Sequence, residues 1–227
     1  MVNEKDIARL KQEQKKLAKK IVLADSISDV KTIAGCDIAC TGNNIICVIV
    51  VMDLQTLKIR ETKYFFDKIR FPHIDGLESY RDAKVLIETY HALELDPDIL
   101  LIDGTGICHS AGIGLASHIG LSLDKCSIGV TKEFNVGKEE NGTIFLKNRS
   151  VAKTLNTKEL AKPIIISPGH KISLETSYDI IKSLIRDHKM PEPLHQAHKV
   201  ANKIRRKLRN GGKVSVDEES GVGFAEA

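Results

Sequence analysis

Two aspartates in apolar surroundings are the residues of this chain that most clearly could do chemistry. Asp37 lies inside the run Ile33–Cys40, whose other residues are apolar or too small to pair with a carboxylate. Asp103 ends the strand-like run Ile99–Ile102. A buried carboxylate is costly unless it is paired or bound to a cation, so two such acids indicate an oxygen-ligand site for Mg²⁺. A basic partner elsewhere, or exposure at a strand end, would also explain Asp37.

Asp82 is a third candidate ligand. Asp75 is expected to cap a helix with Glu78 three residues later, and Asp82 then lies seven residues after the cap, on the same side of the helix. Taken alone, an acid at this position is more often a surface residue, paired with Arg81 or Lys84 or with nothing. Its role therefore depends on where the fold places it.

The turn after Asp103 contains Gly104 and Gly106, which let a backbone, a base or a phosphate approach closely. A dinucleotide-binding oxidoreductase is one alternative for such a turn. The third glycine of that fingerprint is missing, because His109 stands in its place, and an acid before the loop would repel a pyrophosphate. We therefore set this class of enzyme aside.

The elements that must position these acids follow from the apolar pattern. Three strand-like runs, Thr32–Cys40, Ile45–Met52 and Lys58–Phe66, are separated by turns and predict antiparallel hairpins. Strands then alternate with helices, which predicts an α/β fold of the ribonuclease H-like kind, a mixed sheet with helices on both faces. The first strand would run down the middle of the sheet beside a later parallel strand, so that acids on both converge.

The later elements are expected at the following positions. They are a helix over 75–93, a strand over 99–102, a helix over 111–121, a strand over 127–130, a hairpin or loop around Asn141-Gly142, a strand over 164–166, a helix that Ser173 caps, and a final helix after Pro191-Glu192-Pro193. We expect an amphipathic basic helix within 1–25, one domain over 26–209 and a disordered tail over 210–227.

Charge and cysteine content indicate which partners and which cellular compartment to expect. The net charge of the 227 residues is +4, and basic residues gather in 1–20 and in 199–209. Such clusters suit a polyanion, or they are solvated helix faces. The five cysteines form no CxxC pair and are expected to be buried thiols in a reducing cytosol. Without a long apolar stretch or a signal peptide, we expect a cytoplasmic protein, no membrane association and a monomer.

Several ordered motifs together resemble the endonuclease V family over roughly residues 30–205. The central one is Asp103-Gly-Thr-Gly-Ile-Cys-His109, followed by Gly114-Leu-Ala-Ser-His118. The others are Ala34-Gly35-Cys36-Asp37, Phe71-Pro72-His73-Ile74-Asp75-Gly76-Leu77, Ile128-Gly129-Val130-Thr131-Lys132, Lys162-Pro163 with Ser167-Pro168-Gly169-His170, and Pro191-Glu192-Pro193 through His198.

The resemblance implies a Mg²⁺-dependent endonuclease of nucleic-acid repair, with Mn²⁺ as an alternative ion. Such an enzyme cleaves a phosphodiester one nucleotide 3′ to a deaminated purine, hypoxanthine. Asp37 and Asp103 match the family's metal-binding aspartates, and Asp82 falls where the family usually has glutamate. Lys132 matches its active-site lysine and His198 its histidine near the final helix.

The resemblance also implies a pocket for an extruded base and a wedge that fills the gap. Gly104, Gly106, Ser167 and Gly169 are expected around the base, and His109 either contacts the substrate or makes a structural hydrogen bond. The wedge loop, typically Pro-Tyr-Ile-Pro-Gly, is here Pro72-His73-Ile74-Asp75-Gly76. Histidine offers less stacking area than tyrosine, and the lost proline should loosen the loop.

The partner is expected to be inosine-containing DNA, or RNA, because both present the same base. The competing hypothesis is a catalytically weak protein that binds inosine in nucleic acid. That protein would bind tightly, would show negligible Mg²⁺-dependent cleavage and would be indifferent to Asp103→Ala.

Overall fold

The first half of the sheet consists of three long antiparallel strands. In the computed structural model, which describes residues 2–210, these are β1 (Thr32–Thr41), β2 (Asn44–Asp53) and β3 (Ile59–Lys68). A two-residue turn joins the first two, with Gly42 at a φ of +56°. In the second turn the Asp53 carboxylate accepts a hydrogen bond from the backbone N–H of Thr56 at 2.8 Å. The predicted hairpins are confirmed.

Two parallel strands follow β1 across the sheet. β4 (Ile99–Asp103) pairs with β1, and β5 (Cys126–Thr131) pairs with β4. The carboxylate of Asp98 accepts hydrogen bonds from the backbone N–H groups of Lys31 and Thr32, both at 2.9 Å, and so ties the start of β1 to the start of β4. This tie supports the register that pairs Ile33 with Ile99 and continues to Cys36 and Ile102, the residues directly before Asp37 and Asp103.

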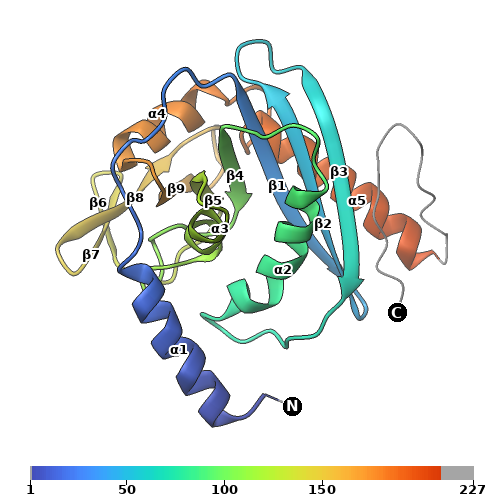
Figure 1. Ribbon diagram of the computed structural model, residues 1–227. Helices are drawn as coiled ribbons and strands as arrows, with labels where there is room; N and C mark the ends of the chain where they lie inside the picture. Colours follow the sequence, from blue (N-terminus) through green and yellow to red (C-terminus); the bar gives the residue numbers. More distant parts are fainter. Residues whose placement is uncertain (1, 211–227) are drawn as a thin grey trace.

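The remaining strands complete a sheet of nine among the described residues, in the order β3-β2-β1-β4-β5-β9-β8-β7-β6 (Figure 1). They are β6 (Lys138–Glu140), β7 (Thr143–Leu146), β8 (Arg149–Leu155) and β9 (Ile164–His170). The Asn141-Gly142 hairpin is confirmed, whereas β8 was not predicted. β9 runs antiparallel to β5 and continues through Pro168 past the predicted end at 166, because a register shift in its pairing with β5 accommodates that segment.

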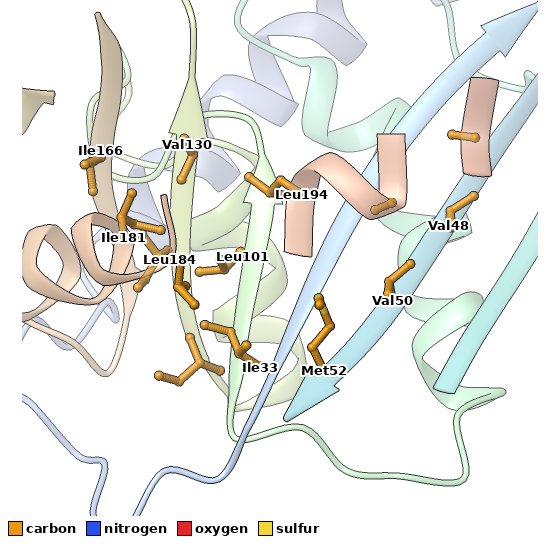
Figure 2. Packing of buried hydrophobic residues seen from close by; sticks show 14 of the residues in the cluster. Ile33, Val48, Val50, Met52, Leu101, Val130, Ile166, Ile181, Leu184 and Leu194 are labelled. Carbon is orange, nitrogen blue, oxygen red and sulfur yellow. The ribbon is translucent and has the colours of Figure 1, made fainter. Parts of the chain in front are cut away.

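Helices cover both faces of the sheet, as predicted. One face carries α2 (Glu78–His91) and α3 (Leu115–Leu123), and the other carries α4 (Leu174–Ser183) and α5 (Glu192–Arg209). Figure 2 shows the second face, where Ile181 and Leu184 of the α4 region and Leu194 of α5 gather with Val50, Leu101 and Val130 of the sheet. The mixed ribonuclease H-like fold is therefore confirmed.

Strand alternation decides which side chains meet α5. Ile33, Leu101 and Val130 belong to the core beneath α4 and α5, whereas Cys36 and Ile102 belong to the core beneath α2 and α3. Side chains an even number of residues apart share a face. Asp37 lies four residues beyond Ile33 and Asp103 two beyond Leu101, so both point to the face that carries α5. Lys132, directly after β5, lines a pocket there together with His198 of α5.

One predicted cap is wrong and another is confirmed. Asp75 does not cap α2, because Gly76 at a φ of +77° turns the chain and Glu78 becomes the first helical residue. Instead, the Glu78 carboxylate accepts a hydrogen bond from the N–H of Gly76 at 2.9 Å. Ser173 does cap α4, since its hydroxyl accepts a hydrogen bond from the N–H of Thr176 at 3.1 Å.

The N-terminal segment is helical and docked. α1 (Glu4–Ala18) begins with a capping box between Asn3 and Asp6. The chain that follows reaches α4, where the Asp25 carboxylate accepts a hydrogen bond from the N–H of Ser173 at 2.7 Å. All five cysteines are free thiols, and no helix within residues 2–210 is long and apolar enough to cross a bilayer. The predicted tail, apart from Asn210, lies outside the described residues.

Candidate active site

Asp37, in the middle of β1, stands beside Asp103, the last residue of the parallel strand β4. Their preceding residues, Cys36 and Ile102, are partners in the β1–β4 register. The Asp37 side chain is buried, and burial raises the pKa of its carboxyl. Burial, and then the negative charge of Asp37, raises the pKa of Asp103 to about 6. The two acids therefore form one electrostatic unit, which favours a cation beside them.

Two basic side chains flank this pair. Nδ1 of His198, on α5, lies 3.0 Å from Oδ2 of Asp37. The charges of His198 and Lys132 both act to lower the pKa values of the two aspartates, but less than burial raises them. The structure thus brings together four of the five predicted catalytic residues, from β1, β4, the end of β5 and α5.

Gly35 permits this arrangement. A Cβ atom at this position would lie 2.1 Å from the backbone oxygen of Pro193 at the start of α5. Any other residue would push the helix away from β1, since real Cβ atoms do not approach backbone so closely. The glycine two residues before Asp37 therefore sets how near His198 comes to that acid.

The Asp82 carboxylate is engaged by Arg81. Nε of Arg81 lies 2.6 Å from its Oδ1 and Nη2 lies 3.0 Å from its Oδ2, a two-pronged ion pair. His73, Asp75 and Glu78 form a group whose potential ligand atoms all lie within 4.8 Å of one another. Within residues 2–210 it is the one group of three His, Cys, Asp or Glu side chains that does so. Asp37, Asp82 and Asp103 are thus not gathered as tightly as that.

A cavity of about 540 Å³ adjoins Asp103. Asp82 borders the same cavity. The third acid is therefore accessible from this cavity even though its carboxylate is paired with Arg81. Gly76, Gly104 and His109, all predicted substrate-binding residues, also line it. Its volume falls within the range of small-molecule sites, which is large enough for an extruded base.

His109 makes the local hydrogen bond that was one of its two expected roles and also faces the cavity. Its Nδ1 accepts a hydrogen bond from the backbone N–H of Ala111 at 3.2 Å, so the ring proton lies on Nε2. Burial lowers the pKa of this imidazole and so favours the neutral form. The ring therefore offers one fixed donor near Gly76.

The predicted wedge loop is exposed and tethered at both ends. Pro72 and His73 are exposed and Ile74 is half-buried, while Nδ1 of His73 lies 3.2 Å from Nη1 of Arg81. At the other end, the buried amide of Gln14, on α1, donates a hydrogen bond to the carbonyl of Gly76 at 2.8 Å. The loop therefore presents its tip to solvent from a fixed base.

Three predicted pocket residues lie behind the cavity rather than along it. The Ser167 hydroxyl is buried, accepts a hydrogen bond from the N–H of Cys108 at 2.9 Å and donates one to the carbonyl of Val151 at 2.8 Å. Gly106 packs against the backbone of Pro168, and Gly169 packs against Ser127. The substrate contact expected of these residues stays a prediction, because the structure gives them packing partners instead.

Gln14 and Arg81 were not predicted as parts of the site. Gln14 is a buried polar residue of α1. Its neighbours in the sequence are a Glu and a Lys, as are those of the exposed Gln12, so the sequence does not distinguish the two. Arg81 was expected only as a possible surface partner of Asp82. Its contact with His73 depends on how the wedge loop folds back, which no local pattern encodes.

Known proteins resemble this chain along most of its length. The endonuclease V family model matches residues 15–199. Endonuclease V of Dictyoglomus turgidum is 37% identical over 193 residues, covering 82% of this chain and 85% of that protein. The relative from Dictyoglomus thermophilum is 35% identical with the same coverage.

Solved structures agree with these matches. Endonuclease V from Bacillus subtilis superposes with a TM-score of 0.83 at 28% identity, covering 93% of this chain and 95% of that one. Endonuclease V from Ciona intestinalis, in complex with a DNA containing an inosine followed by a ribo-adenosine, has a TM-score of 0.83 at 26% identity and covers 91% of this chain and 100% of that one. With matching motifs, sequence and fold, this chain belongs to the endonuclease V family of nucleases.

Proposed function

We propose that this nuclease is a Mg²⁺-dependent repair endonuclease, active as a monomer in the cytoplasm, that hydrolyses a phosphodiester one nucleotide 3′ to a deaminated purine in DNA or RNA. The observation that carries the proposal is the Asp37–Asp103 pair, flanked by Lys132 and His198 and opening onto a base-sized cavity. The inosine-containing DNA bound by the Ciona relative supports the substrate class.

The acid pair fits a magnesium ion. Burial raises the pKa of each carboxyl, and the charge of Asp37 also raises that of Asp103, so a dication would offset both effects. Oxygen ligands are also the ones that Mg²⁺ prefers, and Mn²⁺ accepts them too. Asp37 and Asp103 would hold the ion, and Asp82 would join them after leaving Arg81. A bound ion would polarise the scissile phosphate and make an attacking water more acidic.

The chain's own residues supply the remaining steps. An ionised Asp37 only accepts hydrogen bonds, so His198 donates from Nδ1 and its Nε2 is left to accept a proton from water. This orientation by a carboxylate is the arrangement that makes histidine an effective base. Lys132, beside Asp103, would neutralise the charge that grows on the phosphate in the transition state.

Base recognition would take place in the cavity. Gly76 and Gly104 allow an extruded base to approach the backbone, and Nε2–H of His109 would donate to an acceptor on its edge. Hypoxanthine carries a carbonyl where adenine carries an amino group, so a fixed donor favours the deaminated base. Pro72, His73 and Ile74 would occupy the gap in the stack.

The test compares cleavage of single- and double-stranded DNA and RNA oligonucleotides with one inosine or one adenosine, in Mg²⁺ and in chelator. We expect a metal-dependent nick one nucleotide 3′ to inosine, which Asp103→Ala abolishes. Tight binding without any metal-dependent nick would instead support the inosine-binding hypothesis. The four substrates together also determine the preference between DNA and RNA.

A further inference from the structure

A second pocket, of about 320 Å³, shares Asp103 with the first cavity. Three lysines and three histidines line it: Lys132, Lys158, Lys189, His188, His195 and His198. Asp103 is the one acid along its wall. We call it the basic pocket. An anion that entered it would lie directly beside the acid pair.

The lysines of the basic pocket have no partners. Within residues 2–210, the side chains of Lys132, Lys158 and Lys189 make no hydrogen bond and no ion pair within 4.0 Å. Elsewhere on this surface lysines do find acids; Lys84 pairs with Asp67 at 3.1 Å, for example. Lys132 acts electrostatically on Asp37 and Asp103, whereas Lys158 and Lys189 have no acid of the described residues within 4.0 Å. The ammonium groups around this hollow therefore create a local positive potential that attracts an anion.

Two stacked histidines, His188 and His195, add hydrogen-bonding groups to the basic pocket. The rings of His188 and His195 stack with centroids 3.5 Å apart and planes 16° from parallel. Each ring covers one face of the other, and the ring edges, which carry the nitrogen atoms, remain available as hydrogen-bonding groups. Burial, and then the neighbouring His188, lowers the pKa of His195, which keeps that ring neutral.

We propose that the basic pocket binds the phosphodiester that follows the scissile bond on its 3′ side. This rests on the proposed function, in which the base enters the first cavity and the strand is cleaved on the 3′ side of that base. The strand then passes from the base cavity over Asp103, and the pocket on the far side of the cut receives the next phosphate. Lys158 and Lys189 hold that phosphate, whereas Lys132 serves the reacting one.

Binding measurements with truncated substrates test this polarity. The probe is a fluorescent single-stranded DNA with one inosine, ending either at the cleavage site or four nucleotides beyond it, measured by anisotropy in chelator so that nothing is cut. We expect the double variant Lys158→Ala/Lys189→Ala to bind the longer strand about tenfold more weakly than wild type, and the shorter strand equally well. A neutral methylphosphonate after the cleavage site should weaken wild type by a similar factor and leave the variant unaffected.

The matched control is Lys5→Ala/Lys11→Ala, which removes two exposed lysines of α1 that line neither pocket. It should affect both strand lengths alike. Equal losses for both lengths in Lys158→Ala/Lys189→Ala, or no loss at all, would overturn the proposal. Because no cleavage is needed, this result is independent of whether inosine directs a nick.

A terminal phosphate shares the chemistry of a phosphodiester, so the downstream fragment is tested with a 5′-phosphate and with a 5′-hydroxyl. We expect both forms to compete for the pocket in wild type and neither to compete in Lys158→Ala/Lys189→Ala. Competition by the phosphorylated form alone would assign the pocket to a terminal phosphate and overturn its assignment to the internal one.

Discussion

A single guanidinium connects the two parts of the site that differ from the usual family pattern. Arg81 holds both carboxylate oxygens of Asp82 and also reaches Nδ1 of His73. The usual glutamate is longer than Asp82 by one methylene, and the usual tyrosine has no ring nitrogen to accept from Arg81. The shorter acid and the histidine wedge are therefore linked physically, and a change at one alters the position of the other.

The contribution of the wedge is tested by replacing His73 with Ala and with Tyr. Stacking on a base is worth roughly 1–3 kcal/mol, so His73→Ala should lower kcat/KM on double-stranded inosine DNA by about tenfold. A single strand has no gap to fill, and its kcat/KM should change much less. His73→Tyr should restore or exceed wild-type activity on the duplex. Equal losses on both substrates would show that His73 acts through Arg81 instead of by stacking.

The raised pKa of Asp103 predicts a pH-dependent stability. A carboxyl whose pKa is raised by folding favours the folded state below its unfolded pKa, about 3.9, and that contribution is lost as pH rises through about 6. In chelator, Asp103→Asn should therefore be more stable than wild type at pH 7.5, by at most about 3 kcal/mol, since each pKa unit is worth about 1.4 kcal/mol.

Urea denaturation of both proteins at pH 7.5 and pH 4 checks this expectation. At pH 4 the stability gain should fall to a small fraction of its value at pH 7.5, because the wild-type carboxyl is then protonated in the folded state and about half protonated in the unfolded chain. A gain of the same size at both pH values would assign the effect to packing. Added Mg²⁺ should narrow the difference at pH 7.5, because the ion stabilises only the protein that retains its carboxylate.

Residue chemistry predicted the acid pair but not its surroundings. Asp37 and Asp103 were recognisable because charge is rare inside apolar runs. Ser167, by contrast, sits in a Ser-Pro-Gly-His segment that resembles a turn, and only long-range pairing with β5 makes it a buried strand residue. Local patterns report burial and charge, whereas the partners of a polar group depend on contacts that are distant in sequence.

At the scale of elements, α1 acts as a brace for the wedge loop. Besides the bond from Gln14 to Gly76, the Tyr80 hydroxyl donates a hydrogen bond to the Leu10 carbonyl at 3.1 Å, which fixes the start of α2 against the same helix. The sequence predicted α1 as an amphipathic basic helix with a charged surface. Its contact with the site is made by a polar residue, Gln14, which an analysis of hydrophobic periodicity does not detect.

Gln14→Ala should loosen this brace. Removing the amide takes away a hydrogen bond to the partly buried Gly76 carbonyl, which costs about 0.5–1.5 kcal/mol of stability. The mobile loop should raise KM for inosine DNA several-fold while kcat changes little, because no reacting group is lost. Gln12→Ala, an exposed change on the same helix, is the control and should alter neither stability nor KM. Thermal denaturation and steady-state kinetics measure both quantities, and a fall in kcat alone would refute the bracing role.

Strand order was easier to predict than strand length. The hairpins of β1, β2 and β3 follow from alternation and turn residues, and the pairing of β1 with a later parallel strand follows from the ribonuclease H-like arrangement expected for this order of elements. α2 was expected to begin at Asp75, and the error arose because Gly76 adopts a positive φ that a capping pattern ignores. Ends of elements depend on such single torsions, so they are the least predictable part of the fold.

At the scale of the whole molecule, the outer surface of α5 is a basic strip. Lys203, Arg205, Arg206, Lys207 and Arg209 are all exposed on it. If these residues contact phosphates, replacing Lys203, Arg205 and Arg206 with Ala should reduce the slope of log K against log salt by up to about 2 to 3, since each phosphate contact contributes about 0.7 to 0.9. Anisotropy titrations between low and physiological salt measure the slope. An unchanged slope would identify the strip as merely solvated.

The backbone contact between Gly35 and Pro193 has a consequence for how this protein can evolve. A backbone-to-backbone contact fixes the position of α5 and, with it, of His198. The position of the helix therefore does not depend on the side chains of its outer surface. Mutations that add, remove or reorder the exposed cations can therefore accumulate without displacing the histidine. If these cations contact phosphates, selection can change the strength of nucleic-acid binding without moving His198. A change at Gly35, by contrast, would shift the helix and so affect both binding and the position of the histidine.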